Sequence, residues 1–355
     1  MNAVTMSLPP ASTAAALSPS QAALNDALAD ALLSAKVARA ETLIGEGADV
    51  HGFNISGCSS LAGAALSGKV DAVLMLIRHG VQVIEDESAI TLAARACHGD
   101  VLEALLDVDT SAASLQLAGF AACAPLKFLL YRHLRQPGVP ADTFERLLKR
   151  GLRVGEPSAD GRIMLETAAL AGQVEIMRLI HDAGFDPRDG VEALYLAVTN
   201  GHRDAAERLV QRGVDVDVNN GAALIAAVAA VQDARANQSQ PDDGRRAYRT
   251  LMVESLLALG ADPSMRSHEA ARIAATLGLT NIVAVFLNAG VNLTPIGRPG
   301  DGEGDGKTLR EIALGLGRAE VVAVIDALQQ AQALRANEPT VQPGARSTSR
   351  FEARL

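Results

Sequence analysis

Residues 297–308 form the stretch whose residue types most resemble a binding site for a charged ligand. They read GRPGDGEGDGKT, and a Lys-Thr pair after glycines, here Lys307 and Thr308, is what a phosphate-binding loop presents. That motif requires glycine at position 301, where this chain has Asp301. Carboxylates at this place would repel a polyphosphate. We therefore expect no nucleotide cofactor here.

The same stretch also carries acids in the alternating pattern of a calcium-binding loop. Such a loop ends on a bidentate Glu at its twelfth position, where this chain has Ile312, with Glu311 one residue early. The sequence therefore predicts a solvated loop, with no metal site and no cofactor.

Cys97 and His98 are adjacent, which could indicate an activated thiol. Neighbouring residues on a helix point in different directions, so we expect a structural role for both. The other cysteines, Cys58 and Cys123, lie far away, and three widely spaced cysteines favour neither a disulfide framework nor a zinc site. This usage fits a reducing compartment.

The histidines show no pair at metal-binding spacing. His181 falls in an otherwise apolar pattern, and we expect it at a partly exposed edge. We predict no catalytic residue in the chain, and the protein is not expected to be an enzyme.

Regularly spaced glycines reveal the elements that carry these residues. Gly68 and Gly80 are separated by twelve residues, as are Gly172 and Gly184, with room for one short helix between them. The step from Gly47 to Gly80 is thirty-three residues, which is the period of ankyrin repeats. The glycines expected to end second helices are Gly47, Gly80, Gly151, Gly184, Gly213, Gly260 and Gly290.

An apolar stripe precedes each of these closing glycines. The residues three, four and seven positions earlier lie on one helix face and are apolar, with His181 as the exception. One helix pair cannot bury this stripe, so we expect it to pack against the next pair.

The chain resembles an ankyrin-repeat protein over about residues 21–334. The phrases that carry the resemblance include LAGQVEIMRLIHDAGFDP (170–187), NGHRDAAERLVQRGVDVD (200–217) and LLALGADP (256–263). The family's Thr-Pro-Leu-His opening is absent, which predicts weaker coupling between repeats. His202 follows a turn glycine, where the family commonly has His, so the resemblance implies that it stabilises the turn.

The expected fold is an all-α solenoid of about nine helix-turn-helix repeats with short finger loops. In the third repeat we expect Gly99 at the inner turn and a short second helix that ends at Asp109. Residues 232–247 and 295–306 are expected as polar insertions. Residues 1–20 and 335–355 are expected as disordered tails.

An aromatic cluster in the fourth repeat leaves two interpretations open. Its rings could form a partner interface or fill an irregular core, and we favour the core. The members are Phe120, Phe128, Tyr131 and Phe144.

Composition narrows the possible partners. The formal charge of -9 disfavours nucleic acid, which needs a surplus of Lys and Arg, and no stretch is long enough to span a membrane. We expect a cytoplasmic monomer that binds another protein. The scarcity of Lys beside Arg hints at a bacterial source.

The family resemblance implies that a partner docks on the concave side and the finger loops. The fingers have an acidic bias, which predicts a basic partner surface. The expected partner-binding residues are Asp86, Glu87, Asp160, Asp189, Asp217 and Asn219. As an alternative, the uncharged start of the chain, rich in Ser, Thr and Pro, would suit an effector secreted by a bacterium into a host cell.

Overall fold

The computed structural model describes residues 19–52, 59–83, 87–123, 140–154, 159–229, 242–291 and 307–336. The chain divides into two compact units, Met1–Val216 and Asp217–Leu355, which we call the N-terminal and C-terminal units. The two tails expected to be disordered lie outside the described residues except at their inner edges, and so do the insertion at 295–306 and most of that at 232–247. Cys58, Phe128 and Tyr131 also lie outside.

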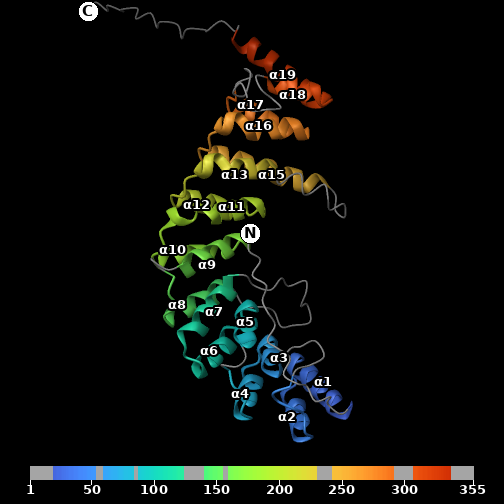
Figure 1. Cartoon of the computed structure of the whole chain (residues 1–355), viewed down its shortest axis with the longest axis vertical. Helices are drawn as coiled ribbons and strands as arrows, with labels where there is room; N and C mark the ends of the chain where they lie inside the picture. Colours follow the sequence, from blue (N-terminus) through green and yellow to red (C-terminus); the bar gives the residue numbers. More distant parts are fainter. Residues whose placement is uncertain are drawn as a thin grey trace, which may run out of the picture. The chain divides into compact units, whose positions relative to one another are not determined.

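Twelve α-helices of the described residues belong to the N-terminal unit, with a 3-10 turn at Pro187–Asp189 (Figure 1). They are α1 (Pro19–Leu33), α2 (Val37–Gly45), α3 (Ser60–Ser67), α4 (Val70–Arg78), α5 (Glu87–Arg95), α6 (Gly99–Val108), α7 (Ala112–Cys123), α8 (Pro140–Lys149), α9 (Ala159–Leu170), α10 (Val174–Asp182), α11 (Val191–Thr199) and α12 (Arg203–Gln211). The described helices of the C-terminal unit are α13 (Val218–Ala229), α15 (Asp242–Ala258), α16 (Met265–Leu277), α17 (Thr280–Asn288), α18 (Leu309–Gly315) and α19 (Ala319–Ala336).

These helices pack as successive pairs in two layers. In the N-terminal unit α1, α3, α5, α7, α9 and α11 contact one another in that order and form the layer of first helices. The layer of second helices follows the order α2, α4, α6, α8, α10 and α12. The C-terminal unit repeats this plan with α13, α16 and α18 beside α15, α17 and α19. The predicted all-α stack of about nine helix pairs is confirmed for the described residues.

Every closing glycine expected from the sequence has a left-handed backbone, with φ between +87° and +107°. At Gly47 the amide donates to the Ile44 carbonyl at 3.0 Å, while the following Ala48 amide donates to Leu43 at 2.9 Å. This pair of hydrogen bonds satisfies the last carbonyls of the helix and requires a residue that tolerates positive φ. The second helices therefore end where the glycine spacing predicts.

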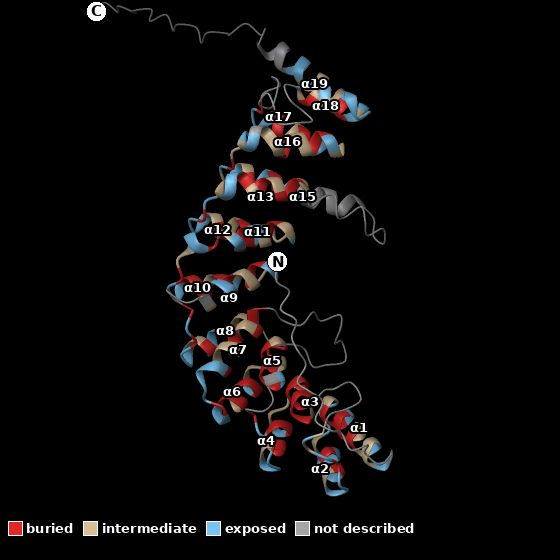
Figure 2. Ribbon diagram, viewed as in Figure 1, coloured by how far each residue is buried: buried red, intermediate tan, exposed pale blue. Residues whose placement is uncertain are grey.

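The apolar stripes form the core of the stack (Figure 2). The residues four and seven positions before the closing glycines are at most 1% exposed. They are Leu43, Leu76, Leu147, Ile180, Leu209, Leu256 and Phe286, with Ala40, Val73, Phe144, Met177, Ala206, Val253 and Val283. Burying each large aliphatic side chain contributes roughly 1.5–3 kcal/mol to the free energy of unfolding. The side chain is buried only when a neighbouring helix pair covers it. Phe144 thus belongs to the core, in line with the favoured interpretation of the aromatic cluster.

The third pair differs from its predicted form. Its inner turn is at Cys97, which has a φ of +57°, whereas Gly99 is the first residue of α6. In the described inner turns the left-handed residue lies two positions before the second helix, so Cys97 occupies the place of Gly68 or Gly172. The predicted short second helix is also wrong, since α6 has 10 residues and the other regular second helices have 9.

A hydrogen bond links the inner turns of neighbouring repeats. The His98 ring nitrogen Nε2 lies 3.2 Å from the Leu66 carbonyl oxygen, and that of His202 lies 2.9 Å from the carbonyl of Leu170. Because a carbonyl only accepts, Nε2 must carry the proton. In the C-terminal unit Arg318 takes this role and donates from Nε to Thr276 at 3.0 Å. The turn-stabilising role implied for His202 is thus visible in the structure.

Glycine at the inner turn makes room for these side chains. A Cβ at Gly172 would lie 2.5 Å from Nδ1 of the His202 ring, in addition to the strain of a φ of +69°. We expect Gly172→Ala to lower the free energy of unfolding by at least about 1–2 kcal/mol, the cost of a left-handed residue with a side chain. Urea denaturation followed by circular dichroism measures this change.

Gly45→Ala is the matched control, because Gly45 ends α2 with no atom near its missing Cβ. It should leave stability unchanged or raise it by up to about 1 kcal/mol, through the higher helix propensity of Ala. Equal effects of the two substitutions would contradict the role of the inner turn.

Candidate functional site

The structure places part of the predicted partner-binding set in the finger loops. Asp189 is exposed at the end of the 3-10 turn that precedes α11. Asn219 is exposed near the start of α13. Glu87 is the first residue of α5, and Asp86 lies outside the described residues. Of the members whose exposure the structure describes, Asp189 and Asn219 are therefore the exposed ones.

Two predicted site residues are engaged within the chain. The Gln116 side-chain amide donates to the Asp160 carboxylate at 3.1 Å and to the Arg153 carbonyl at 3.1 Å. The Asp217 carboxylate accepts the backbone N–H of Asp262, with its two oxygens at 2.9 and 3.1 Å. Both acids thus connect one repeat to the next, whether or not they also contact a partner.

A recurrent aspartate that the site prediction omitted shapes several fingers. It lies two positions after the closing glycine and accepts the N–H two residues further on, at 2.8–2.9 Å. This side-chain turn fixes how the finger leaves the helix. Its fixed spacing from the glycine was a signal that could have revealed it. The residues are Asp49, Asp186 and Asp262.

The finger around Asn219 has an unusual backbone. Asn219, Asn220 and Gly221 have left-handed torsions, with φ of +55°, +58° and +73°. The Gly221 N–H donates to the Asp217 carbonyl at 2.9 Å, and the Asn219 carbonyl accepts from Arg266 Nη2 at 3.1 Å. Asn tolerates this region better than most residues, which accounts for its presence here.

The residues considered for thiol chemistry have structural positions. Cys97 is buried in the inner turn rather than within a helix, and its burial raises the pKa of the thiol to about 11. Burial also raises the pKa of Cys123. A thiol with a raised pKa is a poor nucleophile, so neither environment resembles that of an activated cysteine.

Lys307 and Thr308 belong to a helix start. The Thr308 hydroxyl accepts the Glu311 N–H at 3.1 Å, while the Glu311 carboxylate accepts the Thr308 N–H at 2.8 Å. This capping box satisfies two orphan donors of α18. The hydrogen bond from the Thr308 N–H is the main reason that the pKa of Glu311 is lowered. Within the described residues, no group of three or more His, Cys, Asp or Glu is arranged to hold a metal ion.

The prediction of a partly exposed His181 is wrong. His181 is only 7% exposed, in a position that is half-buried in most repeats. Among the described residues neither ring nitrogen has a hydrogen-bond partner, and the nearby Phe185 N–H donates to the Ile180 carbonyl at 3.3 Å. The Phe185 ring lies 6.5 Å from the imidazole, centroid to centroid. The ring of His181 is thus a core group.

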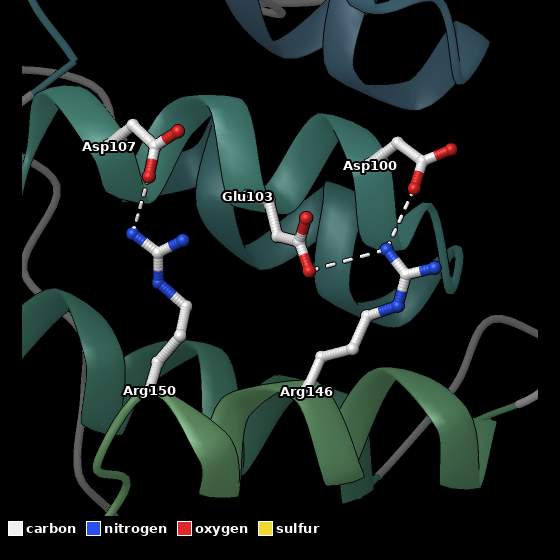
Figure 3. Close-up of polar contacts among 5 residues, drawn as sticks. All are labelled: Asp100, Glu103, Asp107, Arg146 and Arg150. Atoms are coloured by element: carbon white, nitrogen blue, oxygen red, sulfur yellow. Dashed lines mark hydrogen bonds and ion pairs between the residues drawn. The ribbon is translucent and has the colours of Figure 1, made fainter.

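Ion pairs join neighbouring second helices on their solvent side (Figure 3). Arg146 on α8 lies 2.7 Å from Asp100 and 3.3 Å from Glu103 on α6, while Arg150 lies 2.6 Å from Asp107. Their carboxylates are between 43% and 78% exposed, so each pair contributes at most about 1 kcal/mol. These contacts orient two helices and offer no reacting group.

A cavity of about 250 Å³ lies at the end of α6, between Leu106, Leu115 and Arg150. Its polar wall includes Asp109, whose carboxylate accepts the Ser111 N–H at 3.0 Å and the Ser114 hydroxyl. The Ser114 bond is the main cause of the lowered pKa of Asp109. Asp109 therefore supports the start of α7, where the Ser111 hydroxyl accepts the Ser114 N–H at 3.1 Å, in a repeat that lacks a closing glycine.

Burial of His181 predicts a pH effect on stability. Desolvation lowers the pKa of His181, with smaller opposing contributions from Phe185, Asp182 and Asp186 and a reinforcing one from Arg212. The unfolded chain then binds this proton more readily, so stability is lost as pH falls below about 6.5, the ordinary histidine pKa. We expect His181→Leu to reduce the loss of unfolding free energy between pH 7.5 and pH 5.5, measured by urea denaturation. An unchanged pH dependence would contradict the buried neutral imidazole.

Comparison with known proteins gives a family match in the middle of the chain. Residues 135–220 match the model "Ankyrin repeats (3 copies)". This stretch holds α8 to α12 and the fingers with Asp160, Asp189, Asp217 and Asn219.

Two curated proteins show local similarity. Ankyrin repeat and SOCS box protein 2 of Bos taurus is 35% identical over 79 residues, which are 21% of this chain and 12% of that protein. A Caenorhabditis elegans homolog of transient receptor potential cation channel subfamily A member 1 is 29% identical over 174 residues, 46% of this chain and 14% of that protein. The matched stretches thus span about an eighth of each relative. Among the described residues, no helix is both long and apolar enough to cross a bilayer.

Proposed function

We propose that this chain, which is an ankyrin-repeat protein, binds another protein through its finger loops and its layer of first helices. Ankyrin repeats are in general protein–protein interaction modules and typically carry no catalysis. The observation that supports the proposal most is the family match over 135–220, because it contains four of the six predicted partner-binding residues.

The chemistry of the accessible finger residues supports a polar, basic partner surface. Asp189 presents an exposed carboxylate, and the chain as a whole has a formal charge of -9. Charges at the rim of an interface raise association rates and select partners more than they raise affinity. A binding protein without catalytic activity also accounts for the raised thiol pKa values and for the use of Glu311 as a helix cap.

Asp189→Lys tests the proposal, since it reverses a charge on a finger and leaves the described core untouched. Affinity capture from the source cell with the full chain, quantified by mass spectrometry, should recover at least one protein. We expect several-fold less of that protein with Asp189→Lys, because the substitution opposes a basic partner. Recovery should rise at low salt and fall at high salt.

Glu41→Lys on α2 is the control. It makes the same change of charge at an exposed position in the layer of second helices and should leave recovery unchanged. Failure to recover any protein would contradict the proposed function. So would equal recovery with the original chain, Asp189→Lys and Glu41→Lys. Asp217→Lys is unsuitable for this test because it would also release the Asp262 amide.

A further inference from the structure

Two neighbouring first helices expose large apolar side chains. Ile163 and Leu170 on α9 and Tyr195 on α11 are each 43% exposed, although most other apolar residues of these helices are buried in the stack. On α9 the exposed positions 163 and 170 and the half-buried position 166 follow helical spacing and form one face. Large apolar side chains gathered on such a face indicate an interaction surface more than singly scattered ones do.

The faces of α9 and α11 lie side by side. The two helices are in contact (Figure 1). Their repeats are offset by 29 residues, as the steps from Gly172 to Gly201 and from Gly184 to Gly213 show. An offset of 29 places Ile163 opposite Glu192, Glu166 opposite Tyr195, and Leu170 opposite Thr199. Since equivalent positions of adjacent repeats face the same way, these six residues form one array, which we call the α9–α11 face. Five of them alternate between apolar and acidic groups, and Thr199 is the sixth.

The carboxylates of this face are close enough to interact. Burial is the main reason that the pKa of Glu166 is raised; Arg162, at 3.6 Å, lowers it, and Glu192 raises it by a smaller amount. The side chain of Glu166 is 24% exposed, so its charge acts in a partly desolvated setting where a cation would be held more strongly than in water. A positive group between Glu166 and Glu192 would relieve their mutual repulsion.

We propose that the α9–α11 face binds a segment of the partner protein in which a Lys or Arg side chain is flanked by apolar side chains. This inference rests on the proposed function and specifies the chemistry of the segment recognised. The cation lies between Glu166 and Glu192, and the flanking groups pack on Ile163, Leu170 and Tyr195. Tyrosine concentrates binding energy in such interfaces, because its ring buries area at low entropic cost. Arg162 turns away from Glu166 when the partner's cation arrives.

A phage-displayed library of random twelve-residue peptides, selected on the full chain, tests this inference. We expect the enriched peptides to contain Lys or Arg within two residues of Leu, Ile, Phe or Trp. One such peptide, synthesised with a fluorophore, should bind at least tenfold more weakly to the double variant Glu166→Gln, Glu192→Gln and to Tyr195→Ala, by fluorescence anisotropy. The double variant Glu41→Gln, Asp71→Asn removes the same charge from the layer of second helices and should bind like the original chain.

Enrichment of peptides without a basic residue, absence of enrichment, or equal binding to the Glu166→Gln, Glu192→Gln variant would overturn the inference. These results are distinguishable from failure of the proposed function. If affinity capture recovers a partner whose binding is lost with Asp189→Lys but retained in full by the Glu166→Gln, Glu192→Gln variant, protein binding stands and the α9–α11 face is not its site. Thermal melting followed by circular dichroism checks that all variants fold, as expected for exposed and half-buried positions.

Discussion

The structure depends on one constraint, which is that a helix pair of this size cannot bury its own apolar stripe. Leu147 and Phe144 on α8 are at most 1% exposed only because α8 is packed among α6, α7 and α10. Each pair therefore gains its stability from its neighbours, and cooperativity arises from contacts between adjacent repeats. The helices need only to end at the right places, which the left-handed closing glycines ensure.

Hydrogen bonds between polar groups fix the orientation of neighbouring repeats, in addition to this apolar stacking. The bond from the ring of His202 to the Leu170 carbonyl fixes the inner turns against each other, and the bond from the Asp262 N–H to Asp217 fixes two fingers. A finger acid such as Asp217 can therefore serve the stack and still lie on a candidate binding surface, and substitutions there would report on both.

The sequence was most informative where a backbone requirement selects a residue type. The closing glycines and the stripes before them could be located because positive φ and burial each narrow the choice of residue. The inner turn at Cys97 could not be predicted in this way, since a non-glycine residue with a φ of +57° gives no sign of the turn in the sequence. The nearby Gly99 instead suggests a turn two residues too late. The polarity of His181 predicts partial exposure, whereas its neutral imidazole is buried beside Phe185.

The candidate site was harder to predict, because it depends on which side chains are already engaged. An acidic finger residue is visible in the sequence, but its hydrogen-bond partner is not. The partner of Asp160 is Gln116 on α7, which lies 44 residues away and belongs to no local sequence pattern. The alternating array on α9 and α11 likewise becomes visible only once burial separates the exposed positions from those in the stack. Composition and spacing thus predict the fold, and three-dimensional neighbours decide the surface.

Hydrogen exchange of a chain with Leu147→Ala tests most directly whether each repeat is stabilised by its neighbours. The cavity left at this fully buried position should cost about 2–5 kcal/mol locally. The account predicts faster amide exchange in α6 to α10, with protection in α1 and α2 unchanged. An equal loss of protection throughout the N-terminal unit would show a single cooperative core and contradict it.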